Sequence, residues 1–344
     1  EMLRSLVGSE MCIRDRFVTT PTQFYTLRLF TGAAEAGFFP GVVLYLSQWF
    51  PTFRRGRIMA LFMSAIPVSG LLGSPFSGWI LNHFAAGQGG LAGWQWMFLL
   101  QGIPTVILGA LAFFLLSDSF AHAKWLTPTE RAVLEADQAR DLANQPKTAS
   151  DSLAAVFKNP AIWAFGLIYF CIQSGVYAIN FWLPSIIKNL GFADNLVIGW
   201  LSAIPYLLAA VFMLLVGRSA DLRKERRWHL VVPMLMGAVG LLIAVNFAAN
   251  PAIAILGLTL ATMGALTGLP MFWPVPTALL SAGAAAGGLA LINSMGQMAG
   301  FLSPYIVGWV KDSTGSTDAA LYLLAGVIVA GSLLALRMTR TLNR

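Results

Sequence analysis

The sequence predicts an all-α membrane protein that crosses the bilayer several times. Of its 344 residues, 57% are hydrophobic and only 11% are charged, whereas a soluble domain carries about 25% charged residues. The mean hydropathy is +0.70. The apolar residues form continuous runs that far exceed the roughly 10 residues of a barrel strand. Together these observations exclude a soluble enzyme, a disordered chain and a nucleic-acid-binding module.

The charged and metal-binding residue types point to no other partner class. The net charge of +7 comes from short basic clusters between apolar runs, as in membrane proteins, and not from one basic stripe. Cys12 and Cys171 are too far apart to frame a disulfide scaffold, and the three histidines are too scattered for a zinc site. We therefore expect the lipid bilayer as the environment, and no nucleic acid, metal or cofactor.

Nine apolar runs are long enough to span the membrane, since a spanning helix needs roughly 20 predominantly apolar residues. The runs cover residues 24–49, 57–82, 95–117, 160–187, 196–217, 229–248, 251–280, 284–310 and 319–337. Prolines recur inside them, which membrane helices tolerate and which often mark kinks. In the seventh run, Gly268-Leu-Pro-Met-Phe-Trp-Pro-Val-Pro276 predicts local unwinding around Trp273.

The basic residues between the runs set the orientation. Clusters follow the first run at 51–57 and the fifth run at 217–227, and arginines follow the ninth, whereas the loops 83–94 and 248–251 carry no Lys or Arg. By the positive-inside rule the clusters and the C-terminus are cytoplasmic. This topology places residue 1 outside, although residues 1–16 carry arginines and lack the apolar core of a signal peptide. We interpret 1–16 as a non-native leader and the chain as a fragment with further spans upstream.

The polar stretch 118–159 is the only loop of linker length. Within it, Thr127-Pro-Thr-Glu130 predicts a helix start with an acidic first turn. Three spans precede this stretch and six follow it. We therefore expect a partial N-terminal bundle at 17–117, a cytoplasmic linker at 118–159 and a C-terminal six-helix bundle at 160–344. A doubled six-span architecture would lack its first three helices.

Two charged residues lie inside the first apolar run, where charges are costly enough to be functional candidates. Arg28 and Glu35 are seven positions apart, so they project from one helix face about 10 Å apart along the axis. This face is expected to line a polar cavity. Arg28 would be the fixed cation for an anionic substrate, and Glu35 a carboxyl that takes and releases a proton. The alternative is a structural pair that holds two helices together.

The later runs carry neutral polar residues that could line a binding site for a hydroxylated acid. Four of them share one face of the fourth run, one lies at the predicted break in the seventh, and two are a turn apart in the eighth: Tyr169, Gln173, Tyr177 and Asn180; Trp273; Asn293 and Gln297. Hydrogen bonding between helices would explain each residue alone equally well. It is a weaker explanation for Gln173, Asn180 and Asn293 together.

The basic loop after the fifth run also contains acidic residues. It is explained as a positive-inside signal, or as a cytoplasmic gate formed by Asp221, Arg223 and Arg226. In the gate, Asp221 would bond a neighbouring helix end in one conformation and release it in the other. Glycine pairs such as Gly296 and Gly300 indicate close helix packing.

Several sequence blocks resemble the anion:cation symporter family of the major facilitator superfamily. They are Arg28-Leu-Phe-Thr-Gly-Ala-Ala-Glu-Ala-Gly-Phe-Phe-Pro-Gly41 with Tyr45 and Trp49-Phe-Pro51, Trp94-Gln-Trp-Met-Phe-Leu-Leu100 with Gly102-Ile-Pro104, Glu225-Arg-Arg-Trp-His229, Phe272-Trp-Pro-Val-Pro276 and Ala290-Leu-Ile-Asn-Ser294. The resemblance covers about 17–340 and looks closest to bacterial carriers of tartrate, phthalate, galactonate and similar organic acids.

The resemblance implies a twelve-helix carrier that works by alternating access, of which this chain has nine helices: the last three of the N-half and the six of the C-half. It implies that Arg28 is substrate-coupled and Glu35 proton-coupled. Gln173, Trp273 and Asn293 match positions that line the substrate cavity, and Tyr177 and Asn180 match less closely. We expect a monomer in the bacterial inner membrane that carries an organic anion with a proton.

Other functions remain open at this point. Anion exchange and sodium coupling are the nearest alternatives within transport, although no second buried carboxylate favours sodium. A membrane-embedded enzyme or sensor is a remote alternative, because the sequence has no nucleophile–base pair or metal cluster.

Overall fold

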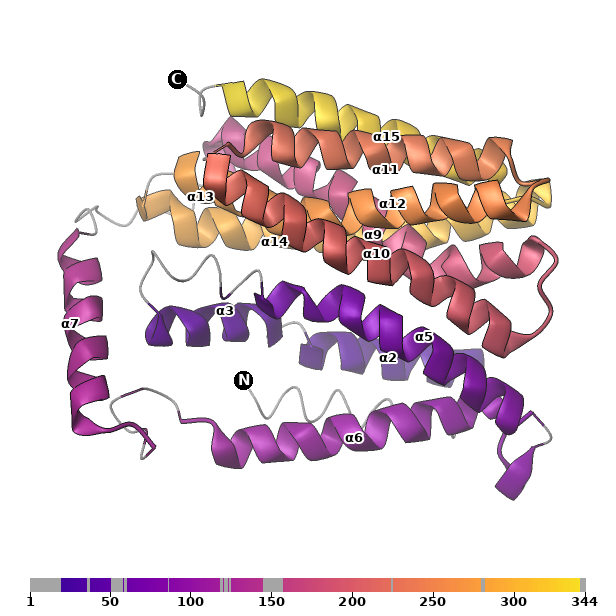
Figure 1. The fold of residues 1–344 in the computed structure, drawn as a ribbon, viewed down its shortest axis with the longest axis horizontal. Coiled ribbons are helices and arrows are strands. Elements are labelled where there is room, and N and C mark those ends of the chain that lie inside the picture. Colours follow the sequence, from indigo (N-terminus) through magenta and orange to yellow (C-terminus); the bar gives the residue numbers. More distant parts are fainter. Residues whose placement is uncertain are drawn as a thin grey trace. The chain divides into compact units, whose positions relative to one another are not determined.

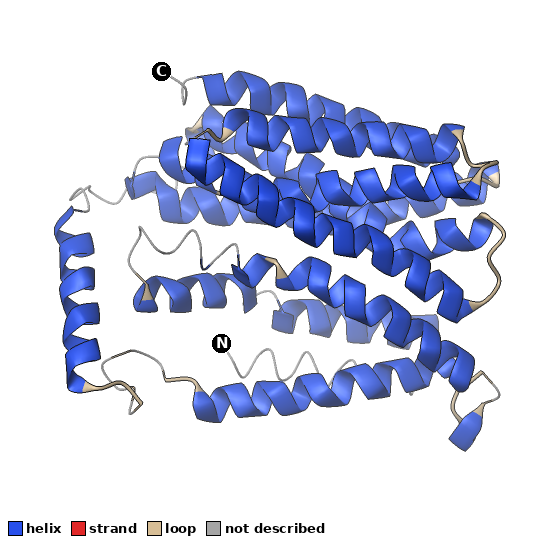
Figure 2. Ribbon diagram, viewed as in Figure 1, coloured by secondary structure: helices blue, strands red, loops and turns tan. Residues whose placement is uncertain are grey.

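The computed structural model of the chain describes residues 20–35, 38–50, 58, 61–85, 87–117, 120, 123, 125–144, 157–223, 225–279 and 282–340. Over these ranges every regular element is a helix and none is a strand, as Figure 2 shows, which confirms the all-α prediction. The predicted leader 1–16 and the basic loop 51–57 lie outside the described residues.

The chain divides into two compact units (Figure 1). The first unit consists of Glu1–Phe62 and Ser77–Gln145, and the second of Met63–Phe76 and Pro146–Arg344. The helices of the first unit are α2 (Pro21–Glu35), α3 (Phe38–Trp49), the 3-10 turn η2 (Gln88–Gly90), α6 (Gly93–Leu115) and α7 (Pro128–Asn144). Those of the second are α9 (Pro160–Asn189), α10 (Asn195–Arg223), α11 (Arg227–Asn246), α12 (Pro251–Phe272), α13 (Pro274–Leu279), α14 (Ala282–Thr314) and α15 (Asp318–Met338). Helix α5 (Ala65–His83) contributes residues to both units.

Seven of the described helical segments are long and apolar enough to cross a membrane: Leu61–His83, Gly93–Leu115, Pro160–Asn189, Asn195–Arg223, Arg227–Asn246, Pro251–Pro276 and Asp318–Met338. They correspond to seven of the nine predicted spans. The predicted span 24–49 coincides with α2 and α3, and the span 284–310 lies inside α14, whose Asn293 and Gln297 lower its hydropathy. The total of nine spans stays a prediction.

Side chains next to the first turns of several helices satisfy backbone N–H groups that a helix cannot pair internally. Asn159 Oδ1 accepts from the N–H of Ala161 at the start of α9, and Asn250 Oδ1 accepts from that of Ala252 at the start of α12. In both helices the next residue is proline, which needs no partner at this position. The predicted helix start at Thr127 is confirmed, because Glu130 accepts from both the N–H and the hydroxyl of Thr127.

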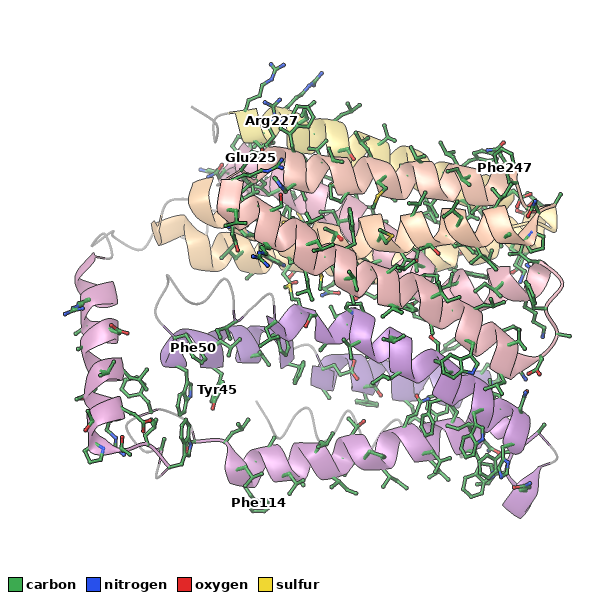
Figure 3. All side chains as sticks on the ribbon, in the orientation of Figure 1. Tyr45, Phe50, Phe114, Glu225, Arg227 and Phe247 are labelled. Atoms are coloured by element: carbon green, nitrogen blue, oxygen red, sulfur yellow. The ribbon has the colours of Figure 1, made fainter. Side chains whose placement is uncertain are left out.

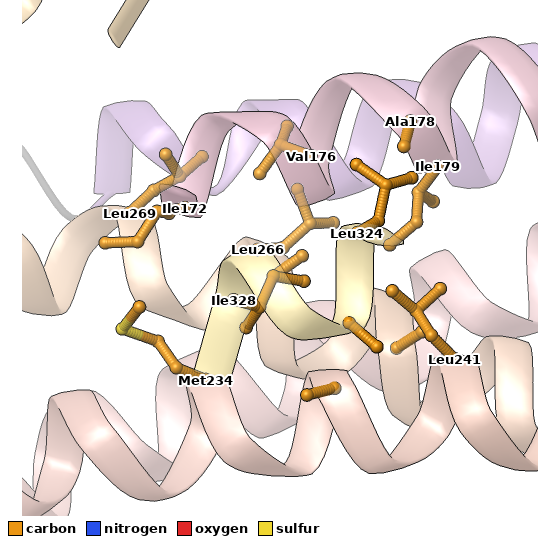
Figure 4. Close-up of a cluster of buried hydrophobic side chains, with 14 of the residues drawn as sticks. Ile172, Val176, Ala178, Ile179, Met234, Leu241, Leu266, Leu269, Leu324 and Ile328 are labelled. Atoms are coloured by element: carbon orange, nitrogen blue, oxygen red, sulfur yellow. The ribbon is translucent and has the colours of Figure 1, made fainter. Parts of the chain in front are cut away.

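The core of the second unit forms around α9. Apolar side chains of α9, α11, α12 and α15 meet in the cluster shown in Figure 4, including Ile172, Ile179, Leu241, Leu266 and Ile328. Each of these side chains is at most 5% exposed. Because the cluster draws one stripe from each helix, it fixes how α9 is rotated relative to its neighbours.

Glycines let α11 and α12 approach until their backbones touch. A Cβ on Gly240 of α11 would lie 2.5 Å from the carbonyl oxygen of Gly257 on α12, a separation that real Cβ atoms do not adopt. Such contact between small residues is how membrane helices gain packing energy without a hydrophobic driving force.

The predicted unwinding around Trp273 is only partly right. The helix is interrupted there, since α12 ends at Phe272 and α13 begins at Pro274. However, Trp273 keeps right-handed helical torsion angles, with φ −58° and ψ −36°. The prolines that follow remove hydrogen-bond donors from the backbone, but their fixed φ is compatible with a helix.

A methyl group at the α11–α12 contact is expected to destabilise the second unit. Gly240→Ala introduces a Cβ that meets backbone atoms, and overpacking of this kind costs about 1–3 kcal/mol. Thermal unfolding of the purified protein in detergent should show a lower melting temperature. The matched control is Gly326→Ala on α15, where nothing lies within 4 Å of the new Cβ. Equal melting temperatures for the two variants would contradict the prediction.

Candidate functional site

Arg28 is stacked between aromatic rings of the first unit. Its guanidinium carbon lies 5.1 Å from the ring centroid of Phe24 on α2 and 5.5 Å from that of Phe98 on α6. Aromatic rings engage the flat face of a guanidinium, whereas a carboxylate binds along its edge, so the two contacts are compatible. The stacking therefore holds a permanent cation in a defined place.

Glu35 lies on the same helix as Arg28 and is the last residue of α2. The seven-residue spacing places both side chains on nearly one side of this helix, and both are exposed. Within the described ranges no ion pair joins Glu35 to Arg28. The structure thus leaves the carboxylate of Glu35 accessible.

In the second unit, two tyrosines of α9 rest on glycines of α14. A Cβ on Gly296 would overlap the ring of Tyr169, and one on Gly300 would lie 2.9 Å from Cζ of Tyr177. The hydroxyl of Tyr177 donates to Oε1 of Gln297, at 2.6 Å. Gly296 and Gly300 therefore leave room for two aromatic rings of α9. This packing brings α9 and α14 into direct contact.

Trp273 belongs to an aromatic group around Tyr169. The Trp273 and Tyr169 ring centroids are 4.9 Å apart in an edge-to-face arrangement, and Phe272 stacks on Tyr169 at 5.0 Å. The structure thus brings together the predicted residues of the fourth and seventh runs. Gln173, one turn along α9 from Tyr169, is buried with 6% of its surface exposed.

Asn293 carries a buried acceptor that has no partner. Its Oδ1 is inaccessible to solvent and receives no hydrogen bond from the described residues. The same holds for Oγ1 of Thr267 on α12, which the sequence did not single out. A buried polar atom without a partner costs free energy, so its presence calls for a reason such as a ligand.

Asn180 is held by a residue that the sequence analysis missed. The hydroxyl of Tyr206 on α10 donates to Oδ1 of Asn180, at 2.8 Å. Tyr206 is buried and Asn180 is exposed. Tyr206 lies 26 positions further along the chain, and the only available signal was an isolated tyrosine within an apolar run.

Two hydrogen-bonded acid–base pairs lie where α10 ends and α11 begins, with Asp221 in the last turn of α10 and His229 in the first turn of α11. Asp221 pairs with Arg226 at 2.5 Å, with 65% and 33% of their side chains exposed. Oε2 of Glu225 lies 2.6 Å from Nδ1 of His229. Arg223, the third predicted gate residue, is exposed. An exposed pair contributes little stability, about 0–1 kcal/mol, so the Asp221 contact can break at low cost.

Glu225 also caps α11. It accepts from the backbone N–H of Trp228 at 2.8 Å. Partial burial acts to raise the pKa of Glu225, but the hydrogen bonds from Trp228 and His229 and the charge of His229 outweigh it, and the pKa is lowered from 4.5. Figure 3 shows Glu225 and Arg227 at one end of the second unit and Phe247 at the opposite end.

Comparisons with known proteins identify what the chain is similar to. The family model of the Major Facilitator Superfamily matches residues 5–304. The "Putative metabolite transport protein NicT" of Pseudomonas putida is 43% identical over 329 residues, or 95% of this chain and 75% of that protein. A "Putative tartrate transporter" of Agrobacterium vitis is 43% identical over 325 residues, covering 94% of this chain and 74% of that protein. The crystal structure of a D-xylose-proton symporter has a TM-score of 0.70 at 17% identity, over 97% of this chain and 78% of that one, a likeness of fold alone.

Replacing Asn293 on α14, whose Oδ1 has no partner among the described residues, is expected to stabilise the protein. Asn293→Leu removes a buried acceptor without a described partner and should raise the melting temperature. Gln297→Leu, one turn away, removes the acceptor of the Tyr177 hydroxyl and should cost about 1 kcal/mol. Thermal unfolding of both variants tests the pair. A loss of stability in Asn293→Leu as large as that in Gln297→Leu would mean that Asn293 is an ordinary structural residue.

The cap formed by Glu225 predicts a pH dependence. Since its pKa is lowered from 4.5 on folding, its contribution is fully present above that value and is lost as the pH falls through the lower folded pKa. At neutral pH, Glu225→Gln should therefore lower the free energy of unfolding by about 1 kcal/mol and lower the melting temperature. The difference in melting temperature from the original protein should disappear in acid. Glu135→Gln, an exposed carboxylate on α7, is the control. A gap of constant size across this range would argue against the cap.

Proposed function

The chain belongs to the Major Facilitator Superfamily, and from this premise we propose that it is a secondary active transporter that carries an organic anion together with a proton. It is a multi-pass membrane protein of a transporter family and not an enzyme. Relatives are named for metabolite and tartrate transport. The substrate class we propose is a sugar acid, a tartrate-like dicarboxylate or an aromatic carboxylate.

The observation that carries this proposal is the presence of two charged side chains, Arg28 and Glu35, on α2. Arg28 is a cation that cannot be discharged, and stacking between Phe24 and Phe98 fixes its position. A carboxylate can pair with such a guanidinium in a bidentate manner, which a neutral sugar cannot. Arg28 is therefore the residue that selects an anion.

Glu35 is the proposed proton carrier. A carboxylate next to the substrate anion would repel it, whereas a protonated carboxyl would not. Binding of the anion and of the proton then favour each other, which is the thermodynamic requirement for symport. No second acidic side chain lies within α2.

The polar residues of the second unit would bind the rest of the substrate. Gln173, Tyr177, Asn180 and Trp273 offer amide, hydroxyl and indole groups, and Asn293 offers an acceptor that lacks a protein partner among the described residues. A hydroxylated acid has hydroxyl groups that could donate to that acceptor. The unsatisfied Oδ1 of Asn293 thus supports a substrate that carries a hydroxyl donor over a purely apolar one.

Alternating access requires contacts that break in each cycle. We propose that Asp221, Arg223 and Arg226 form the cytoplasmic gate, in which Asp221 exchanges Arg226 for a neighbouring helix end. The low stability of an exposed pair suits this role. In the proposed topology, 17–117 and 160–344 are helical bundles joined by the cytoplasmic linker 118–159. The C-terminus is cytoplasmic, and the protein acts as a monomer in the bacterial inner membrane.

Exchange of one anion for another and coupling to sodium are the competing mechanisms. Symport predicts that substrate uptake alkalinises a weakly buffered medium, whereas exchange does not. Sodium coupling predicts that removal of sodium stops uptake. Recording proton and substrate uptake together in vesicles distinguishes the three.

Neutralising Glu35 is expected to separate transport from proton coupling. In vesicles that contain the protein, Glu35→Gln should abolish accumulation of labelled tartrate driven by a proton gradient. It should retain counterflow, the exchange of labelled for unlabelled tartrate without a gradient.

Arg28→Gln provides the contrast, since loss of the substrate cation should abolish accumulation and counterflow alike. If Glu35→Gln also lost counterflow, Glu35 would serve binding or folding and not proton coupling.

A further inference from the structure

We propose that Tyr206 is a positioning residue for the substrate: it orients the amide of Asn180 so that this amide presents hydrogen-bond donors to a carboxylate. The inference rests on the proposed function and deepens it, because it assigns a selectivity role to a residue outside the binding residues named above. It follows from two contacts and one exposed side chain within the second unit, which involve α9, α10 and the part of α5 that lies in Met63–Phe76.

The first contact is the hydrogen bond between the two side chains. Tyr206 Oη donates to Asn180 Oδ1 at 2.8 Å. Tyr206 is only 6% exposed, and Asn180 is its one acceptor in the described part of the chain. If the amide rotated by half a turn, its NH₂ would donate to Tyr206 Oη, but the buried hydroxyl proton would lose its one described acceptor, which is unfavourable. The oxygen of Asn180 is therefore held toward Tyr206.

The second feature is the exposure of Asn180. It lies on the α9 face that also carries Gln173 and Tyr177, and its side chain is accessible. With the amide oxygen engaged by Tyr206, the accessible part of the group is its NH₂, which has donors and no acceptor. Donors bind a carboxylate in a charge-assisted bond that is stronger than a bond to a neutral hydroxyl.

The third observation is a contact that fixes the position of the Tyr206 ring. A Cβ on Gly70 of α5 would lie 2.6 Å from ring carbons of Tyr206, so the ring lies directly against the backbone of α5. About two turns earlier on α10, a Cβ on Gly199 would lie 2.6 Å from the carbonyl oxygen of Ser74. Helices α5 and α10 therefore touch at two glycines, and their contact sets where the Tyr206 hydroxyl is.

These contacts connect α5 to the proposed substrate site. The ring of Tyr206 packs against Gly70, and the Tyr206 hydroxyl orients the amide of Asn180. A shift of α5 against α10 would displace the hydroxyl and release the amide. The affinity for the carboxylate is thus tied to the packing of α5 on α10, without a direct contact between α5 and Asn180.

The test is Tyr206→Phe, which keeps the ring on Gly70 and removes only the hydroxyl. Uptake of labelled tartrate in proteoliposomes should show KM raised about tenfold, the equivalent of 1.4 kcal/mol, with kcat within about twofold. Competition by unlabelled tartrate and by threitol, in which CH₂OH replaces each carboxylate, should show a smaller preference for the acid. This loss of selectivity is a result that a merely structural hydroxyl would not give.

Three further variants complete the test. Asn180→Ala should raise KM by a similar factor, and the double variant should add little, since both changes remove one interaction. Gly70→Ala should reproduce the KM change by displacing the ring, which keeps the proposal testable if Tyr206→Phe folds poorly. Tyr322→Phe is the matched control: it removes an equivalent bond, from Tyr322 Oη to Oδ1 of Asn246 at 2.9 Å, between α15 and α11.

The outcomes separate this inference from the proposed function. If the original protein takes up tartrate and Tyr206→Phe matches Tyr322→Phe in KM and in acid preference, the positioning role is wrong and organic-anion transport stands. Additive effects of Tyr206→Phe and Asn180→Ala would also overturn it. If the original protein takes up no organic acid at all, the proposed function fails and this inference falls with it.

Discussion

The free energy of leaving a polar group unpaired in an apolar surrounding is the constraint on which this molecule depends. It forces the backbone into helices, since only a helix pairs its own N–H and C=O groups within one segment. It also keeps charges out of the middle of most apolar runs, which leaves Arg28 and Glu35 conspicuous on α2. The same constraint explains the capping side chains Asn159 and Asn250, which meet N–H groups at helix starts.

Within the second unit, α9 links structure to function. One side of this helix contributes Ile172 and Ile179 to the apolar core. Another carries tyrosines that rest on glycines of α14 and an asparagine bound by Tyr206. The core fixes the rotation of α9, and that rotation decides which polar side chains face the proposed substrate. Under the proposed function, stability and selectivity therefore depend on different faces of the same helix.

Hydropathy and charge were sufficient to predict the all-α class, seven of the spans and the start of α7 at Thr127, because these depend on local composition. They could not predict that the ring of Tyr177 packs against Gly300 or that the Tyr206 hydroxyl donates to Asn180. Such contacts depend on how each helix is rotated about its axis, and a helix that is apolar on all sides gives no sign of its rotation. The interruption at Trp273 was predicted from its prolines, but its helical torsion angles were not, since the residue before a proline is biased toward an extended backbone.

The contact between Gly70 and Tyr206 has a consequence for how such a carrier diverges. A side chain at position 70 would need a smaller ring at position 206, and a smaller residue there would release the amide of Asn180. No single substitution at position 70 or 206 keeps both the packing of α5 on α10 and the orientation of the Asn180 amide. Under the proposed function, a change of substrate range that keeps this packing would therefore need changes at other proposed binding residues, because positions 70, 180 and 206 depend on one another.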